Sequence, residues 1–158
     1  MELNKESEPR WVVTDDEEFL LSSESIADVV DLLHQLRGNP HGQLTLWERK
    51  GAVADLSPWR KLVSRLTGPA QTHIMHFDLC WIADVAAIIF YDARGGEYRV
   101  IAENAIQASS EIRRLLSFGE VSPLGEEYCL AKERAFELVQ LYTRETRIPT
   151  EVRYNFVP

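Results

Sequence analysis

The chain has 158 residues, of which 45% are hydrophobic, and a net charge of -8. This length is enough for one domain with its own hydrophobic core, so no disulfide or metal is needed to hold the fold. The negative charge argues against direct binding of DNA or RNA, because phosphate contacts require Lys and Arg. There is no membrane-length apolar stretch and no secretion signal, so we expect a cytoplasmic protein with no membrane partner.

Most of the negative charge lies near the N-terminus. Residues 1–25 hold eight acidic and two basic residues, which leaves a charge of only -2 for the rest of the chain. The densest point is the run Asp15, Asp16, Glu17 and Glu18. An acidic arm at about 1–25 favours a basic protein partner, since complementary charges speed encounter. The alternative, which charge alone favours, is a solvated arm that only promotes solubility.

The first half of the chain predicts two helices and a strand. One helix should begin at a Ser25 cap, present a face of apolar residues to the core, and end before Gly38. Residues 43–49 alternate apolar and polar side chains, which is typical of a strand. Ser57 and Pro58 then start a second helix that runs to about Leu66.

The middle of the chain predicts a sheet. Residues 71–81 alternate, residues 85–91 are continuously apolar as in a strand covered on both faces, and residues 97–103 return after a turn at 92–96. Residues 111–118 fit either a short strand or a helical turn. With helices at both ends and strands between them, we predict a single α+β domain, residues 1–158, with a mainly antiparallel β-sheet and flanking helices.

The last thirty residues have the most distinctive pattern. Residues 130–142 are amphipathic with a helical period, Pro149 cannot continue a helix, and residues 150–156 alternate as a strand. The positions that carry the pattern are Glu126, Glu127, Tyr128, Ala131, Phe136, Tyr142, Pro149, Val152, Arg153 and Tyr154. This ending resembles the closing segment of a bacterial immunity-protein family whose members accompany polymorphic toxins with nucleic-acid deaminase domains.

The strongest candidate for a metal site is the alternating set His76, Asp78 and Cys80. On a regular strand these three side chains point the same way, and all three types can bind zinc. Such a ligand set is crowded, however, and no fourth ligand pattern occurs elsewhere, so a half-buried strand face is the preferred interpretation. We therefore expect no metal or other cofactor, and we expect Cys80 and Cys129 to be reduced core thiols.

No catalytic motif is present. The sequence lacks a nucleophile elbow, a phosphate-binding glycine loop and the His-x-Glu with Pro-Cys-x-x-Cys signature of zinc deaminases. The expectation is therefore that the chain is no enzyme and is not itself the deaminase.

The resemblance implies an immunity protein that binds and inhibits a cognate toxin, a zinc-dependent nucleic-acid cytidine deaminase, by covering its active site or its basic substrate groove. Two alternatives remain: a small zinc-dependent enzyme and an adaptor that inhibits nothing. Acidic and aromatic residues are the candidate contacts with the toxin, because aromatic side chains carry much of the binding energy at interfaces. The predicted contacts are Trp11, Asp15, Asp16, Glu17, Glu18, Trp47, Tyr91, Asp92, Glu97 and Glu103.

Overall fold

The computed structural model describes residues 10–15, 18–50 and 72–158. The helix expected between Ser57 and Leu66 lies outside these ranges, as do the acidic residues Asp16 and Glu17. None of the helices within the described ranges is long and apolar enough to cross a membrane.

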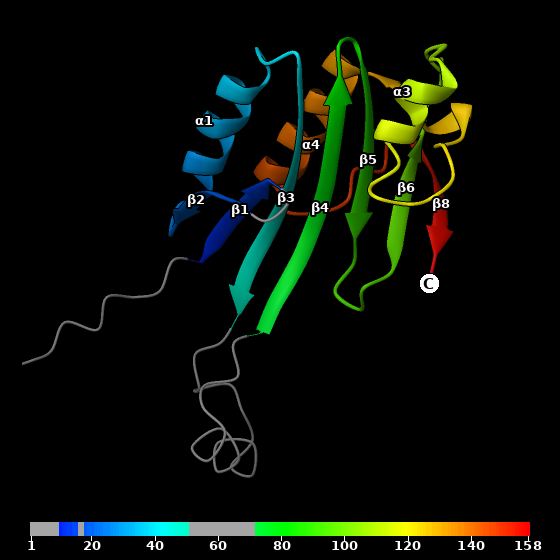
Figure 1. Cartoon of the computed structure of the whole chain (residues 1–158). Helices are drawn as coiled ribbons and strands as arrows, with labels where there is room; N and C mark the ends of the chain where they lie inside the picture. Colours follow the sequence, from blue (N-terminus) through cyan, green and yellow to red (C-terminus); the bar gives the residue numbers. More distant parts are fainter. Residues whose placement is uncertain (1–9, 16–17, 51–71) are drawn as a thin grey trace, which may run out of the picture.

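An eight-stranded antiparallel sheet forms the centre of the fold (Figure 1). Its strands are β1 (Trp11–Asp15), β2 (Glu18–Ser23), β3 (His41–Lys50), β4 (Thr72–Ile82), β5 (Val85–Tyr91), β6 (Glu97–Ile101), β7 (Leu130–Ala131) and β8 (Arg153–Val157). The strand order is β2-β1-β3-β4-β5-β6-β8, and β7 pairs with β5. The predicted α+β fold with a mainly antiparallel sheet is confirmed.

The helices lie on both faces of the sheet (Figure 1). Helices α1 (Ile26–Leu36) and α4 (Lys132–Glu145) cover one face, which we call the helix-covered face. The opposite face carries α3 (Ser110–Leu115) and the 3-10 helix η2 (Glu126–Tyr128) at one end only. The predicted Ser25 cap is confirmed, because its side chain accepts a hydrogen bond from Ala27 N at 3.3 Å.

The main hydrophobic core lies between the sheet and α1 and α4. Trp81 packs edge-on against Phe136 of α4 with ring centroids 5.1 Å apart, and Phe90 stacks on Tyr142 at 5.3 Å. A second buried cluster lies under α3 and the segment that follows it; its members are Cys80, Val85, Ala87, Leu116, Leu124 and Cys129. Strand β5 contributes to both clusters, which explains its continuously apolar sequence.

Four local expectations need correction. Trp11–Asp15 and Glu18–Ser23 are paired strands, and β1 also pairs with β3, so this part of the expected acidic arm belongs to the sheet. Leu130–Ala131 pairs with β5, which delays the start of the last helix to Lys132. The last strand begins at Arg153, later than expected, and β6 ends early at Ile101. For the segment 111–118, where a short strand and a helical turn were both open, the helical alternative is confirmed by the short helix α3.

Candidate functional site

A network of polar side chains lies on the face of the sheet opposite α1 and α4. We call this surface the polar face; it comprises Thr14, Thr45, Trp47, Asp78, Tyr91, Glu97 and Arg99. These residues come from five neighbouring strands, β1 and β3 to β6, and strand pairing places them side by side. Each is only partly buried, so the polar face is a surface on which another molecule can lie.

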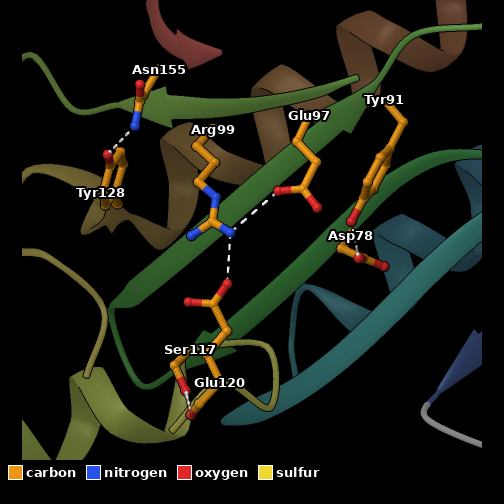
Figure 2. A network of polar contacts seen from close by, with 8 residues as sticks. All are labelled: Asp78, Tyr91, Glu97, Arg99, Ser117, Glu120, Tyr128 and Asn155. Carbon is orange, nitrogen blue, oxygen red and sulfur yellow. Dashed lines mark hydrogen bonds and ion pairs between the residues drawn. The ribbon is translucent and has the colours of Figure 1, made fainter. Parts of the chain in front are cut away.

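Asp78 is at the centre of the polar face. Tyr91 donates a hydrogen bond from its hydroxyl to Asp78 Oδ2 at 2.7 Å (Figure 2). The Thr45 hydroxyl donates to Asp78 Oδ1. Burial raises the pKa of Asp78 above its usual value of 3.8. The two hydrogen bonds act in the opposite direction without cancelling this effect, and the charge of Glu97 adds to it. Asp78 therefore lies in an environment that disfavours its charged form. Ionisable residues with perturbed pKa values of this kind are concentrated at functional sites.

The aromatic residues of the polar face are held in place by hydrogen bonds. Burial, followed by the contact with Asp78, raises the pKa of Tyr91 well above its ordinary value, so Tyr91 stays a neutral donor. Trp47 Nε1 donates to Thr14 Oγ1 at 3.1 Å across the β1–β3 pair. Both rings are therefore fixed in orientation before any partner arrives, which lowers the entropic cost of binding.

Arg99 links the sheet to the loop that follows α3. Its guanidinium contacts Glu97 at 3.2 Å and Glu120 at 2.7 Å (Figure 2). The hydrogen bond to Glu120 is the main reason that the pKa of Arg99 is raised. Ser117 Oγ donates to the backbone oxygen of Glu120 at 3.0 Å, which fixes the same loop. The loop therefore forms one rigid border of the polar face.

The structure brings together three of the predicted partner-binding residues and separates others. Trp47, Tyr91 and Glu97 share the polar face. Trp11 was predicted to contact a partner, which requires an exposed side chain, but it is only 3% exposed. It lies on the helix-covered face, with its ring 5.3 Å from that of His76. The β1–β3 pairing makes the difference, because it turns Trp11 toward the core.

The remaining acidic candidates lie in three places, with Asp15 and Glu18 directly opposite each other on β1 and β2. Asp15 is half-buried at the end of β1, and Glu18 is exposed at the start of β2. Asp92 shapes the β5–β6 turn, since its carboxylate accepts hydrogen bonds from the backbone nitrogens of Arg94 at 2.8 Å and Gly96 at 2.9 Å. Glu103 is exposed beyond β6, where it lines a cavity of about 220 Å³ beside the start of α4. Turn geometry accounts for Asp92 without a partner.

The expected alignment of His76, Asp78 and Cys80 is wrong. The β3–β4 register shifts between Leu46, which lies opposite Phe77, and Trp47, which lies opposite Met75, so His76 is the bulged residue of β4. A bulge redirects one side chain. No group of three or more His, Cys, Asp or Glu side chains within residues 10–15, 18–50 and 72–158 could hold a metal ion.

The bulge brings His76 into contact with a buried ion pair that the sequence did not predict. His76 Nε2 lies 2.7 Å from Glu48 Oε2, and its Nδ1 contacts the Tyr142 hydroxyl. Glu48 is 4% exposed, and Arg10 Nε donates to its other oxygen at 2.8 Å. Burial would raise the pKa of Glu48, but the hydrogen bonds from Arg10 and His76 outweigh it, so that pKa is lowered. The cluster ties β3 and β4 to α4.

Cys80 and Cys129 are free and buried, as expected of core thiols. Burial, together with the nearby charges of Asp15 and Asp78, raises the pKa of Cys80 to about 12. Burial likewise raises the pKa of Cys129. Because the thiolate is the reactive form, neither side chain is suited to nucleophilic chemistry at neutral pH.

The raised pKa of Asp78 predicts that Asp78→Asn stabilises the protein at neutral pH. A carboxyl whose pKa is higher in the folded state binds its proton more tightly there, so its ionisation destabilises the fold as the pH rises above 3.8. The gain in free energy of unfolding should therefore be larger at pH 7 than at pH 3.5 when measured by urea unfolding. The exposed Asp31→Asn is the matched control for the loss of one surface carboxylate. A loss of stability at pH 7 for Asp78→Asn would contradict the prediction.

Comparison with known proteins gives no assignment. No protein-family model matches the chain, and a search of curated proteins finds no match.

Proposed function

We propose that this chain is a cytoplasmic immunity protein that binds and inhibits a cognate bacterial toxin, a zinc-dependent cytidine deaminase acting on nucleic acid. The polar face is the observation that supports a protein-binding role. It combines two oriented aromatic rings, Trp47 and Tyr91, with the carboxylates of Asp78 and Glu97. Aromatic anchors with complementary charges around them are typical of tight interfaces. The choice of toxin class rests on the resemblance of the C-terminal segment.

The proposed mechanism is steric and electrostatic. An enzyme that acts on nucleic acid carries a basic groove for the phosphate backbone. The acidic and aromatic polar face would cover this groove, so that the target base cannot reach the zinc-bound water. No covalent chemistry by the chain is required.

The test begins with identification of the partner. The tagged chain is used to capture proteins from its source cells, and mass spectrometry should recover a protein with His-x-Glu and Pro-Cys-x-x-Cys motifs. The purified chain should then abolish the deaminase activity of that protein at a one-to-one ratio. We expect a dissociation constant of about 1 nM or tighter, roughly -12 kcal/mol, because little free toxin can be tolerated by the cell. The interface should bury on the order of 1,600 Å².

Other outcomes would favour other functions. Inhibition of a different toxin would keep the immunity role and discard the deaminase. Capture of a partner whose activity is unchanged would favour a non-inhibitory adaptor, and a micromolar constant with the cognate toxin would contradict the proposal. The zinc-enzyme alternative predicts stoichiometric bound zinc in the purified protein; it receives no support from the set His76, Asp78 and Cys80, because the bulge turns His76 to the helix-covered face.

A further inference from the structure

We propose that two copies of this chain pair through β8 to form a symmetric dimer with one continuous sheet. Strand β8 is the outermost strand at one end of the sheet (Figure 1). Within the described part of the chain it pairs only with β6, in a regular register from Arg153 opposite Ile101 to Val157 opposite Glu97. A regular outermost strand presents a row of backbone donors and acceptors to which a further strand can add.

The two edges of the sheet differ in how well they are protected. At the other edge, the β1–β2 register shifts between Val13 and Thr14, which leaves Leu20 of β2 without a cross-strand partner. Such a bulge interrupts the regular row of backbone groups and discourages further pairing. Strand β8 has no register shift, and since neither β8 nor β2 contains lysine or proline, the bulge is what distinguishes the two edges. The β8 edge is therefore the one open to pairing.

Apolar side chains extend to the β8 edge. Phe156 is 50% exposed and Val157 is 38% exposed. The Phe156 ring lies 4.8 Å from that of Tyr98, and Tyr98 lies 5.9 Å from Tyr154. An aromatic cluster on the helix-covered face thus continues to the edge of the sheet, where it is only partly covered. Exposed apolar groups of this kind mark interaction sites.

A second copy is the occupant that β8 fits best, because the strand is complementary to itself. In an antiparallel pair centred on Asn155, Tyr154 of each copy lies opposite Phe156 of the other, which forms two aromatic cross-strand pairs. Arg153, the only charged residue of β8, lies opposite Val157 of the other copy. The neighbour of that valine on β6 is Glu97, so opposite charges approach each other at both ends of the junction.

Asn155 would lie on the symmetry axis. Its Nδ2 donates to the Tyr128 hydroxyl at 2.7 Å, which fixes the orientation of the amide. The amide has a second N–H and a carbonyl oxygen, so the two Asn155 side chains can exchange hydrogen bonds across the axis. A contact of this type uses the same surface of both copies, so the assembly is complete as a dimer. Pairing of β8 of one copy with β2 of the next would instead let the assembly grow without limit.

The dimer should be weak, because two five-residue strands bury less area than a standard interface. Sedimentation equilibrium of the full chain should give the mass of one chain, 18.1 kDa, at low micromolar concentration and approach twice that value at high micromolar concentration. The experiment uses this chain alone, so its outcome is independent of whether a toxin is bound. A mass of one chain at every concentration would overturn the dimer.

Two variants test the interface itself. Asn155→Lys places like charges directly opposite each other and should weaken dimerisation about tenfold or more, whereas Gln107→Lys adds the same charge to an exposed loop residue and should leave it unchanged. Phe156→Ser removes the exposed ring and should also weaken the dimer. Circular dichroism establishes which variants remain folded. If either β8 variant is folded and dimerises as strongly as the unmodified chain, the proposed interface is wrong.

Discussion

Replacing Glu48 with alanine is expected to lower the free energy of unfolding by about 3 kcal/mol. Glu48 is 4% exposed and accepts hydrogen bonds from both Arg10 and His76. Its loss leaves His76 without its acceptor in a largely buried site. Because the Arg10 side chain is 56% exposed and can be hydrated again, we expect the lower end of the range for broken buried ion pairs.

The matched control is Glu133→Ala. Glu133 also pairs with an arginine, Arg37, but its side chain is 64% exposed, so its loss should cost less than about 1 kcal/mol. Urea unfolding monitored by circular dichroism gives both values. Similar losses for Glu48→Ala and Glu133→Ala would show that the buried Glu48 ion pair contributes no more to stability than a surface ion pair.

The stabilisation by Glu48 and its partners Arg10 and His76 has a predictable pH dependence. The pKa of Glu48 is lowered from 4.5 in the folded protein, so its stabilising contribution is fully present above that value. As the pH falls through the lower folded-state pKa, the carboxylate is protonated and the contribution is lost. The difference in stability between the unmodified chain and Glu48→Ala should therefore shrink in acid. A difference that stays constant from pH 7 to pH 3 would contradict this assignment.

If the proposed function holds, replacing Trp47 with alanine is expected to weaken binding of the proposed toxin about 30-fold or more, corresponding to at least 2 kcal/mol. Trp47 presents a large ring that is already oriented by its hydrogen bond to Thr14. Interface tryptophans of this kind carry much of the binding energy. Isothermal titration calorimetry with the captured toxin measures the change.

Two controls separate the role of the ring from effects on the fold. Trp47→Phe keeps an aromatic ring and should lose less affinity than Trp47→Ala. Thr14→Val removes the acceptor for the indole while leaving the indole itself, so it should have a small effect on binding. Unchanged affinity for folded Trp47→Ala, together with unchanged affinity for Tyr91→Ala, would show that the toxin binds to a different face.

Much of the fold could be predicted because local patterns reflect burial. The continuous apolar run of β5 follows from its two covered faces, and the amphipathic pattern of α4 follows from one buried face. The start of α1 was also predictable, since a serine cap acts through the nearest backbone amide. The N-terminal strands were missed because their acidic composition resembles that of an unpaired arm.

The candidate functional site was only partly predictable. Trp47, Tyr91 and Glu97 were expected to contact a partner, but nothing in the sequence indicated that they share one face with Asp78. Arg99 and Glu120 were missed because their pairing joins segments 21 residues apart through the arrangement of the sheet. The exposure of Trp11 was mispredicted for the same reason, since burial there depends on a strand more than thirty residues away.

The sequence by itself determined the class of fold, most of the strands and helices, the reduced state expected of the two cysteines, and the absence of known catalytic motifs. These properties depend on short-range periodicity and on residue type. Only the tertiary structure decided which strands are neighbours, that a bulge separates His76 from Asp78, and that Glu48 is buried in an ion pair. The physical reason is that strand order and register are set by contacts between segments far apart in the chain, and one shifted residue reverses the direction of a side chain.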